Sequence, residues 1–160
     1  TRFSQIKNIL NRISNKSNEY KLDVSKVHVV ITGDFNAGKG EVVDELLLSG
    51  ALKWDYRQQG YPDVDVVQSK NKTDYSHPWK FGSAYDHIED EAKRKQILTF
   101  YARDSFACID HVYFTRNTAQ CLFCTETVPP WLAQNEKLQC PNEKLVSDHL
   151  PIASFFQFNS

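Results

Sequence analysis

Three short polar motifs in this 160-residue chain combine residue types that work together in hydrolytic sites. They are Gly33-Asp34-Phe35-Asn36, Ile109-Asp110-His111 and Ser147-Asp148-His149. The first follows an apolar run, the second interrupts one and the third precedes one. Sites in open α/β sheets lie outside the ends of strands, where loops converge. We therefore predict that the three motifs meet in one pocket.

The side chains of these motifs can serve complementary roles. Asp34 and Asn36 alternate along an extended backbone, so both can face the same way. Asp148 and His149 are adjacent, so one can face a metal ion while the other faces a substrate. A remote acid such as Asp110 can hold an imidazole in one tautomer, as the aspartate of a Ser-His-Asp triad does.

Each motif also has a purely structural interpretation. Residues 33–36 are typical of a turn, because Gly, Asp and Asn dominate turns. Residues 147–149 are compatible with a surface turn that caps a helix. Asp110 is harder to explain in this way, because a carboxylate inside an apolar strand is costly unless it is paired. Together the motifs favour a functional site.

The hydrophobic pattern predicts the elements that position these motifs. They are a helix over about 2–15, a strand over 27–32 buried on both faces, a helix over 41–48, an exposed charged helix over 85–97, strands 107–115 and 119–126 joined as a hairpin, and a final strand over 152–158. Strands that alternate with helices indicate a layered α/β domain.

The composition narrows the class of protein. The chain has 19 basic and 20 acidic residues, so its overall charge gives no reason to expect nucleic acid or an anionic membrane. That balance still allows a nucleic-acid enzyme that grips its substrate at one site. No apolar run approaches the roughly 20 residues of a membrane span. The four cysteines favour a reducing compartment, and we expect a cytoplasmic protein, with a nuclear location as an alternative.

The three motifs in this order resemble the endonuclease/exonuclease/phosphatase superfamily. Its members carry a G-D-x-N segment after a buried strand, an aspartate in an I-D-Y-type strand, and S-D-H before a final strand. Finer features resemble the carbon-catabolite-repressor type of deadenylase and its nocturnin-like relatives. These features are Arg2, Gln5 and Leu10 in the first helix, residues 46–50, residues 82–85, and Pro130-Trp131-Leu132 followed by Cys140-Pro141. One departure is His111, where the family often has tyrosine.

The resemblance implies a metal-dependent phosphodiesterase and a role for each motif. Asp34 would orient the attacking water and, with Asp148, contribute to a site for Mg²⁺ or Mn²⁺. Asn36 would hydrogen-bond a phosphoryl oxygen of the substrate. His149 would stabilise the transition state, with Asp110 fixing its ring. Mg²⁺ prefers oxygen ligands, which these carboxylates and the amide supply.

The same resemblance implies a 3′–5′ exoribonuclease acting on polyadenylate RNA. Phe106 would then stack on adenine, although Ser105 is an alternative match for the family's aromatic position. One alternative keeps the chemistry but takes a nucleotide, a 2′,5′-linked oligonucleotide, a nicotinamide dinucleotide phosphate or a phosphoinositide. Another is a non-catalytic domain that binds a partner protein.

The resemblance covers only the C-terminal half of the superfamily's fold, a four-layer α/β sandwich of mixed or antiparallel sheets with flanking helices. The chain starts at Thr1 and contains no methionine, so we expect residues 1–160 to be a single partial domain of a longer protein. The family's first half supplies an asparagine and a metal-binding glutamate. We therefore expect the chain alone to be inactive, with a sheet face that the missing half or a partner protein covers.

Overall fold

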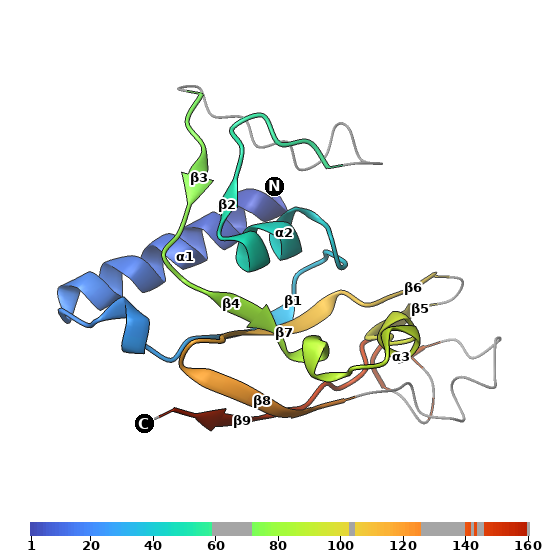
Figure 1. Ribbon diagram of the computed structural model, residues 1–160. Helices are drawn as coiled ribbons and strands as arrows, with labels where there is room; N and C mark the ends of the chain where they lie inside the picture. The colour runs from blue at the N-terminus through green and yellow to red at the C-terminus, as the bar shows by residue number, and fades with distance from the viewer. Residues whose placement is uncertain (59–71, 103–104, 126–139, 142, 144–145, 160) are drawn as a thin grey trace.

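The structure, a computed structural model, describes residues 1–58, 72–102, 105–125, 140–141, 143 and 146–159 (Figure 1). The predicted feature Pro130-Trp131-Leu132 lies outside these residues. The helical segments are α1 (Arg2–Glu19), η1 (Val24–Lys26), α2 (Val42–Ser49), η2 (Ala84–His87) and α3 (Glu91–Lys95). The strands are β1 (Val30–Asp34), β2 (Ala51–Leu52), β3 (Tyr75–Ser76), β4 (Phe81–Ser83), β5 (Phe100–Ala102), β6 (Ser105–Ala107), β7 (Asp110–Thr115), β8 (Ala119–Cys124) and β9 (Ser154–Phe158).

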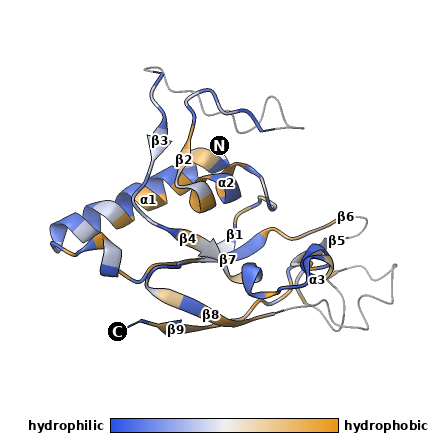
Figure 2. Cartoon of the chain, viewed as in Figure 1, coloured by the Kyte–Doolittle hydropathy of each residue, from blue (hydrophilic) through white to orange (hydrophobic). Residues whose placement is uncertain are grey.

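Helices α1 and α2 form where the apolar spacing predicts them. Thr1 caps α1, since its side chain accepts a hydrogen bond from the Ser4 backbone N–H. The residues of α1 that face the core recur at helical spacing (Phe3, Ile6 and Leu10), and Figure 2 shows hydrophobic and hydrophilic positions alternating along this helix. Helix α2 ends at Gly50, whose φ of 82° is the left-handed conformation that glycine adopts without strain.

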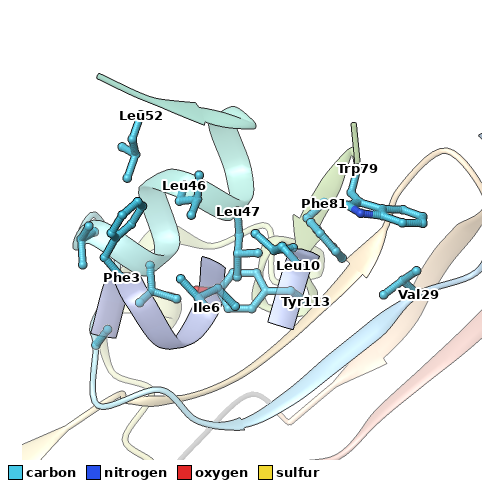
Figure 3. Packing of buried hydrophobic residues seen from close by; sticks show 13 residues of the cluster. Phe3, Ile6, Leu10, Val29, Leu46, Leu47, Leu52, Trp79, Phe81 and Tyr113 are labelled. Atoms are coloured by element: carbon cyan, nitrogen blue, oxygen red, sulfur yellow. The ribbon is translucent and has the colours of Figure 1, made fainter. Parts of the chain in front are cut away.

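Strand β7 is the centre of a three-stranded antiparallel sheet with the order β1-β7-β4. Helices α1 and α2 lie over one face of this sheet (Figure 1). Their apolar side chains pack with those of the strands in one buried cluster, which Figure 3 shows from close by. The cluster includes Ile6, Leu10, Leu46, Leu47, Phe81 and Tyr113.

The prediction that residues 27–32 form a strand buried on both faces is wrong in part. The strand exists, but it begins at Val30 and is largely exposed. Among the described residues β1 pairs with β7 alone, so it is an edge strand. Its β-branched residues are compatible with either position, because propensity does not show how many neighbours a strand has.

The predicted hairpin between residues 107–115 and 119–126 is also wrong. Strand β7 pairs with β1 and β4, whereas β8 pairs with β9 in a separate antiparallel sheet. The turn between β7 and β8 carries the chain from one layer to the next, and the layers pack through contacts such as Phe114 against Phe156, with ring centroids 5.0 Å apart. Helices, a first sheet and a second sheet therefore form successive layers, as the predicted α/β sandwich requires (Figure 1).

The charged segment 85–97 does not form the single helix predicted. Helix η2 ends at His87, and α3 begins after Asp90, whose side chain accepts hydrogen bonds from the backbone N–H groups of Ala92 and Lys93. Asp90 therefore starts a new helix rather than continuing an old one. Within the part of the chain that the structure describes, no helix is both long and apolar enough to cross a membrane.

Candidate active site

The antiparallel pairing of β1 and β7 brings two predicted site residues together. Strand β1 ends at Asp34 and strand β7 begins at Asp110, and these two residues are register partners. Because neighbouring antiparallel strands run in opposite directions, the end of one lies beside the start of the other. The first two motifs therefore meet at one edge of the sheet, 76 residues apart in sequence by their numbering.

His149 reaches the same edge from the third motif. Residue 149 forms a single β-bridge with Phe100, beside a hydrogen bond from the Tyr101 N–H to the Asp148 carbonyl (2.7 Å). The His149 Nδ1 atom lies 2.8 Å from Asp110 Oδ2. A carboxylate can only accept a hydrogen bond, so Nδ1 carries the proton and Nε2 is directed elsewhere. Nε2 lies 4.0 Å from Asp34 Oδ2, which is beyond hydrogen-bonding distance.

The carboxylates around His149 change its acidity. The hydrogen bond that His149 donates to Asp110 raises the pKa of His149 above its ordinary value, and the negative charges of Asp110, Asp34 and Asp148 raise it further, against a smaller opposing effect of burial. The cationic imidazolium is therefore populated over a wider range of pH than in a free histidine. A cation at this position suits a reaction that builds negative charge on oxygen.

Asn36 is held beside Asp34 by a compact local turn. The Asn36 backbone N–H donates to Asp34 Oδ1 (2.7 Å), and its side-chain Nδ2 donates to Asp34 Oδ2 (3.1 Å). Asn36 has a φ of 49°, in the left-handed region that asparagine tolerates better than most residues. The turn interpretation of this motif is thus right about local structure. It also leaves the second N–H of the Asn36 amide available.

Two buried side chains, His111 on β7 and Asp44 on α2, fix the loop that carries Asp34 and Asn36. The buried His111 donates from Nε2 to the Ala37 carbonyl (2.8 Å). Asp44, buried on α2, accepts from the Gly40 N–H (2.7 Å) and from the Tyr113 hydroxyl (2.9 Å). Sequence reasoning missed the role of Asp44. The available signal was the acidic pair Asp44-Glu45 inside the otherwise apolar run of residues 42–48, because a carboxylate is costly to bury without partners.

Arg2 ties the same loop to the first helix. Its guanidinium donates to the Asn36 carbonyl and pairs with the carboxylate of Glu41. Arg2 is one of the residues that carry the family resemblance, which assigns it no role. The structure shows that it joins the start of α1 to the loop, so the position of Asn36 depends on helix packing as well as on its own turn.

Phe106 lies on β6, next to the site, in the hairpin that β6 forms with β5. Its side chain is 65% exposed, and its ring stacks on that of Tyr101 at 6.3 Å with an angle of 21° between the planes. Phe100, on the other strand end of this hairpin, has its ring 5.2 Å from that of His149. Phe106 thus belongs to the same pair of strands whose residue Phe100 contacts His149.

The predicted metal ligands are Asp34 and Asp148. Asp148 is half-buried, and its backbone is fixed next to Tyr101. In the ranges that the structure describes, no group of three or more His, Cys, Asp or Glu residues is arranged to hold a metal ion. Mg²⁺ is commonly bound through one or two carboxylates, with water and substrate phosphate as the other ligands. The carboxylate oxygens of Asp34 and Asp148 are therefore of the kind that Mg²⁺ or Mn²⁺ prefers. These two residues do not by themselves supply all the ligands of such an ion.

Comparison with known proteins identifies similar sequences. No protein-family model matches the chain. The chain is 26% identical over 142 residues to the CCR4-Not complex 3′-5′-exoribonuclease subunit Ccr4 of Saccharomyces cerevisiae, which covers 89% of the chain and 16% of the yeast protein. It is also 26% identical over 144 residues to the subunit of the same name from Coccidioides immitis, covering 85% of the chain and 17% of that protein. The chain thus spans less than a fifth of these relatives.

Solved structures share the fold. The structure of ANGEL2, a 2′,3′-cyclic phosphatase, in complex with adenosine-2′,3′-vanadate matches 81% of this chain and 44% of its own chain, with a TM-score of 0.59 and 19% identity. The human Nocturnin catalytic domain with bound sulfate matches 99% of this chain and 41% of its own, with a TM-score of 0.56 and 16% identity.

These similarities confirm the predicted resemblance to the endonuclease/exonuclease/phosphatase superfamily and the predicted α/β sandwich fold. The chain is similar to the Ccr4 exoribonuclease subunits in sequence, and to ANGEL2 and Nocturnin in fold.

Proposed function

We propose that this chain forms part of a metal-dependent phosphodiesterase, a 3′–5′ exoribonuclease that removes adenylate residues from RNA. The observation that carries the proposal is the position of His149, which is hydrogen-bonded to Asp110 at 2.8 Å and faces Asp34 at 4.0 Å. The names of the yeast and fungal relatives support the choice of reaction.

In this reaction a water molecule attacks the phosphorus atom and the bond to the 3′ oxygen breaks. The products are a nucleoside 5′-monophosphate and a new 3′-hydroxyl. The Asp34 carboxylate, exposed at the strand end, accepts a hydrogen bond from the water and orients it. Asn36 donates its second amide N–H to a phosphoryl oxygen, because its first is already given to Asp34.

His149 stabilises the negative charge that develops on the phosphoryl oxygens. Its Nε2 is the ring atom not occupied by Asp110, so a protonated ring donates from Nε2 to the substrate. Asp110 keeps the ring in place and favours its charged form. Donors fixed in advance are effective because they need no reorganisation during the reaction.

The proposed cofactor is Mg²⁺, or Mn²⁺ in its place, held in part by Asp34 and Asp148. Such an ion supplies positive charge that neutralises the phosphoryl oxygens. The negative charges of both carboxylates raise the pKa of His149, which supports placing the ion near that ring.

The proposed substrate-binding surface is the exposed ring of Phe106, which packs on the buried ring of Tyr101. An exposed aromatic ring can stack on a nucleic-acid base without reading its sequence. The exposed ring of Phe106 therefore supports the proposal that the site binds a single-stranded end. A preference for adenine is proposed from the relatives rather than from the ring itself.

A protein surface is the proposed partner of the second sheet. Large apolar side chains are exposed on β8 and β9, among them Leu122, Phe123, Phe155 and Phe158. Such a group of exposed residues on a sheet often marks an interface. Either a further part of the same protein or a separate protein would cover it.

The test is a comparison of substrates. The 160-residue chain, and the longer protein that we expect to contain it, are incubated with oligo(A), oligo(C), an oligonucleotide ending in a 2′,3′-cyclic phosphate, and nicotinamide dinucleotide phosphate. We expect release of 5′-AMP from oligo(A), dependent on Mg²⁺ or Mn²⁺ and abolished by a chelator.

Other outcomes are equally informative. Faster turnover of the cyclic phosphate or of the dinucleotide would contradict the exoribonuclease hypothesis and favour a phosphatase that uses the same site. Absence of product from every substrate, in both proteins and with either metal, would favour the non-catalytic, partner-binding alternative.

A further inference from the structure

Thr99 is a fully buried polar residue at the point where the segments that carry Asp110 and His149 meet. Its exposed fraction is 0%. A buried hydroxyl needs hydrogen-bond partners, and those partners show what it holds in place. Thr99 belongs to none of the three motifs, and it immediately precedes strand β5.

The Thr99 hydroxyl oxygen fixes the start of strand β7. It accepts hydrogen bonds from the backbone N–H groups of Ile109 (3.0 Å) and Asp110 (2.9 Å). A hydroxyl has two acceptor lone pairs, and both are used here. Thr99 thus holds the backbone of Asp110, the residue whose side chain contacts His149.

The Thr99 backbone fixes the segment that carries His149. Its carbonyl accepts from the Leu150 N–H at 2.7 Å. Two residues on, the Tyr101 N–H donates to the Asp148 carbonyl at 2.7 Å, and Phe100 forms the bridge with His149. His149 is therefore bracketed on both sides by bonds to the short segment that Thr99 begins.

The Thr99 N–H completes the arrangement by donating to the Ala107 carbonyl at 3.0 Å. One residue therefore makes hydrogen bonds to the segment before β7, to the first residue of β7 and to the segment of the third motif. We propose that Thr99 is a positioning residue, which sets the 2.8 Å contact between Asp110 and His149 without touching the substrate. This inference rests on the proposed function for its catalytic meaning, but the positioning itself can be measured separately.

The hydroxyl, rather than the shape of the side chain, is what this inference concerns. Thr99→Val keeps the branched shape and removes the acceptor, which leaves two buried N–H groups without a partner. Thr99→Ser keeps the acceptor and loses one methyl group. A purely space-filling role predicts that Ser disturbs the site at least as much as Val, whereas a positioning role predicts the reverse.

The first readout is the tautomer of His149 in the 160-residue chain, measured from long-range ¹H–¹⁵N correlations of the imidazole at alkaline pH. We expect the proton on Nδ1 in the wild type and in Thr99→Ser, because Asp110 accepts it. We expect a mixture of tautomers in Thr99→Val. This measurement does not depend on any enzymatic activity, so it stays decisive if the proposed function fails.

The second readout is turnover of the preferred substrate, measured in the 160-residue chain or in the longer protein, depending on which of them is active. We expect Thr99→Val to lower kcat by about 10- to 100-fold with little change in KM, because a misplacement of about 1 Å can cost about 10²-fold. Thr99→Ser should stay close to the wild type. If no substrate is turned over, the proposed function is contradicted. The His149 tautomer still tests whether Thr99 positions the two side chains.

Thr118→Val is the matched control. Thr118 is also buried, and its hydroxyl lies 2.7 Å from that of Thr115, at the opposite end of β7 from Asp110. It should leave the His149 tautomer unchanged. If Thr99→Val does not fold, Thr99→Cys replaces it, because a thiol is a much weaker acceptor. A folded Val or Cys variant that keeps the wild-type tautomer would overturn the proposal, as would a change of the same size in Thr118→Val.

Discussion

Asp34 and Asp110 are directly opposite each other across the antiparallel pair of β1 and β7. Like charges in such a cross-strand position are destabilising. His149 offsets this repulsion, since its ring is bonded to Asp110 and its Nε2 faces Asp34. The same arrangement that relieves the strand pair supplies a cation where a phosphoryl group would need one. One imidazole therefore offsets a local repulsion at the strand ends and is also the group on which the proposed chemistry depends.

The variant His149→Ala should lose turnover while keeping its fold. We expect a loss of about 10²- to 10⁴-fold in kcat, the usual contribution of a positioned proton donor. The ring is at the rim of the sheet and partly exposed, so the near-ultraviolet circular dichroism should be preserved. The matched control is His87→Ala, which removes an exposed histidine from η2. Near-normal rates in His149→Ala would show that the imidazole does not take part.

The variant Asp110→Asn should lower kcat strongly with its backbone intact. An amide can donate as well as accept, so it no longer holds the Nδ1–H tautomer of His149, and it removes the charge that raises the pKa of that ring. In a comparable triad the same change costs about 10⁴-fold. The pH profile is the informative measurement, because the pKa assigned to His149 should fall in the variant. A profile and a rate like those of the wild type would mean that Asp110 is structural.

The motifs could be found from the sequence because each is a short run of adjacent or alternating residues. Asp34 and Asn36 are two residues apart, and their side chains meet in one turn. Helices α1 and α2 were also predictable, because the apolar spacing that defines them is local.

The pairing of strands could not be predicted in the same way. Residues 116–118 look like a hairpin turn, but both edges of β7 are taken by β1 and β4. The Thr115 hydroxyl accepts from the Val29 N–H (3.0 Å), and the Thr118 hydroxyl donates to the Val27 carbonyl (3.3 Å). These contacts join residues more than 80 positions apart by their numbering. No local sequence pattern predicts which strands will pair. The hydrogen bonds of Thr99 could not be predicted for the same reason.

Phe106→Ala tests the proposed stacking surface. Base stacking on an aromatic ring is worth about 1–3 kcal/mol, so we expect KM for oligo(A) to rise by about 5- to 100-fold with a smaller change in kcat. Phe155→Ala is a close control, because both side chains are 65% exposed and Phe155 lies on the second sheet. Equal effects of the two variants on KM would remove Phe106 from the substrate site.

His111→Phe should change how stability depends on pH. Burial lowers the pKa of His111 below its ordinary value, against smaller opposing effects of its bond to Ala37 and of nearby acids. The folded state therefore favours the neutral ring. The stability that it contributes is present above the unfolded pKa of about 6.5 and is lost as the pH falls towards the folded pKa. The loss is at most about 1.4 kcal/mol per pH unit for one group.

The phenylalanine variant cannot take up this proton, so its free energy of unfolding should fall less between pH 7.5 and pH 5.5 than that of the wild type. It should also be less stable at every pH, because the hydrogen bond to the Ala37 carbonyl is gone. The comparison cancels His149, whose raised pKa acts in the opposite direction, and His77, whose pKa burial lowers, since both are present in each protein. Urea titrations across this range, with a chelator present, give the two slopes. Identical slopes would mean that His111 carries the same charge in the folded and unfolded states, contrary to its burial against Phe35 and Tyr113.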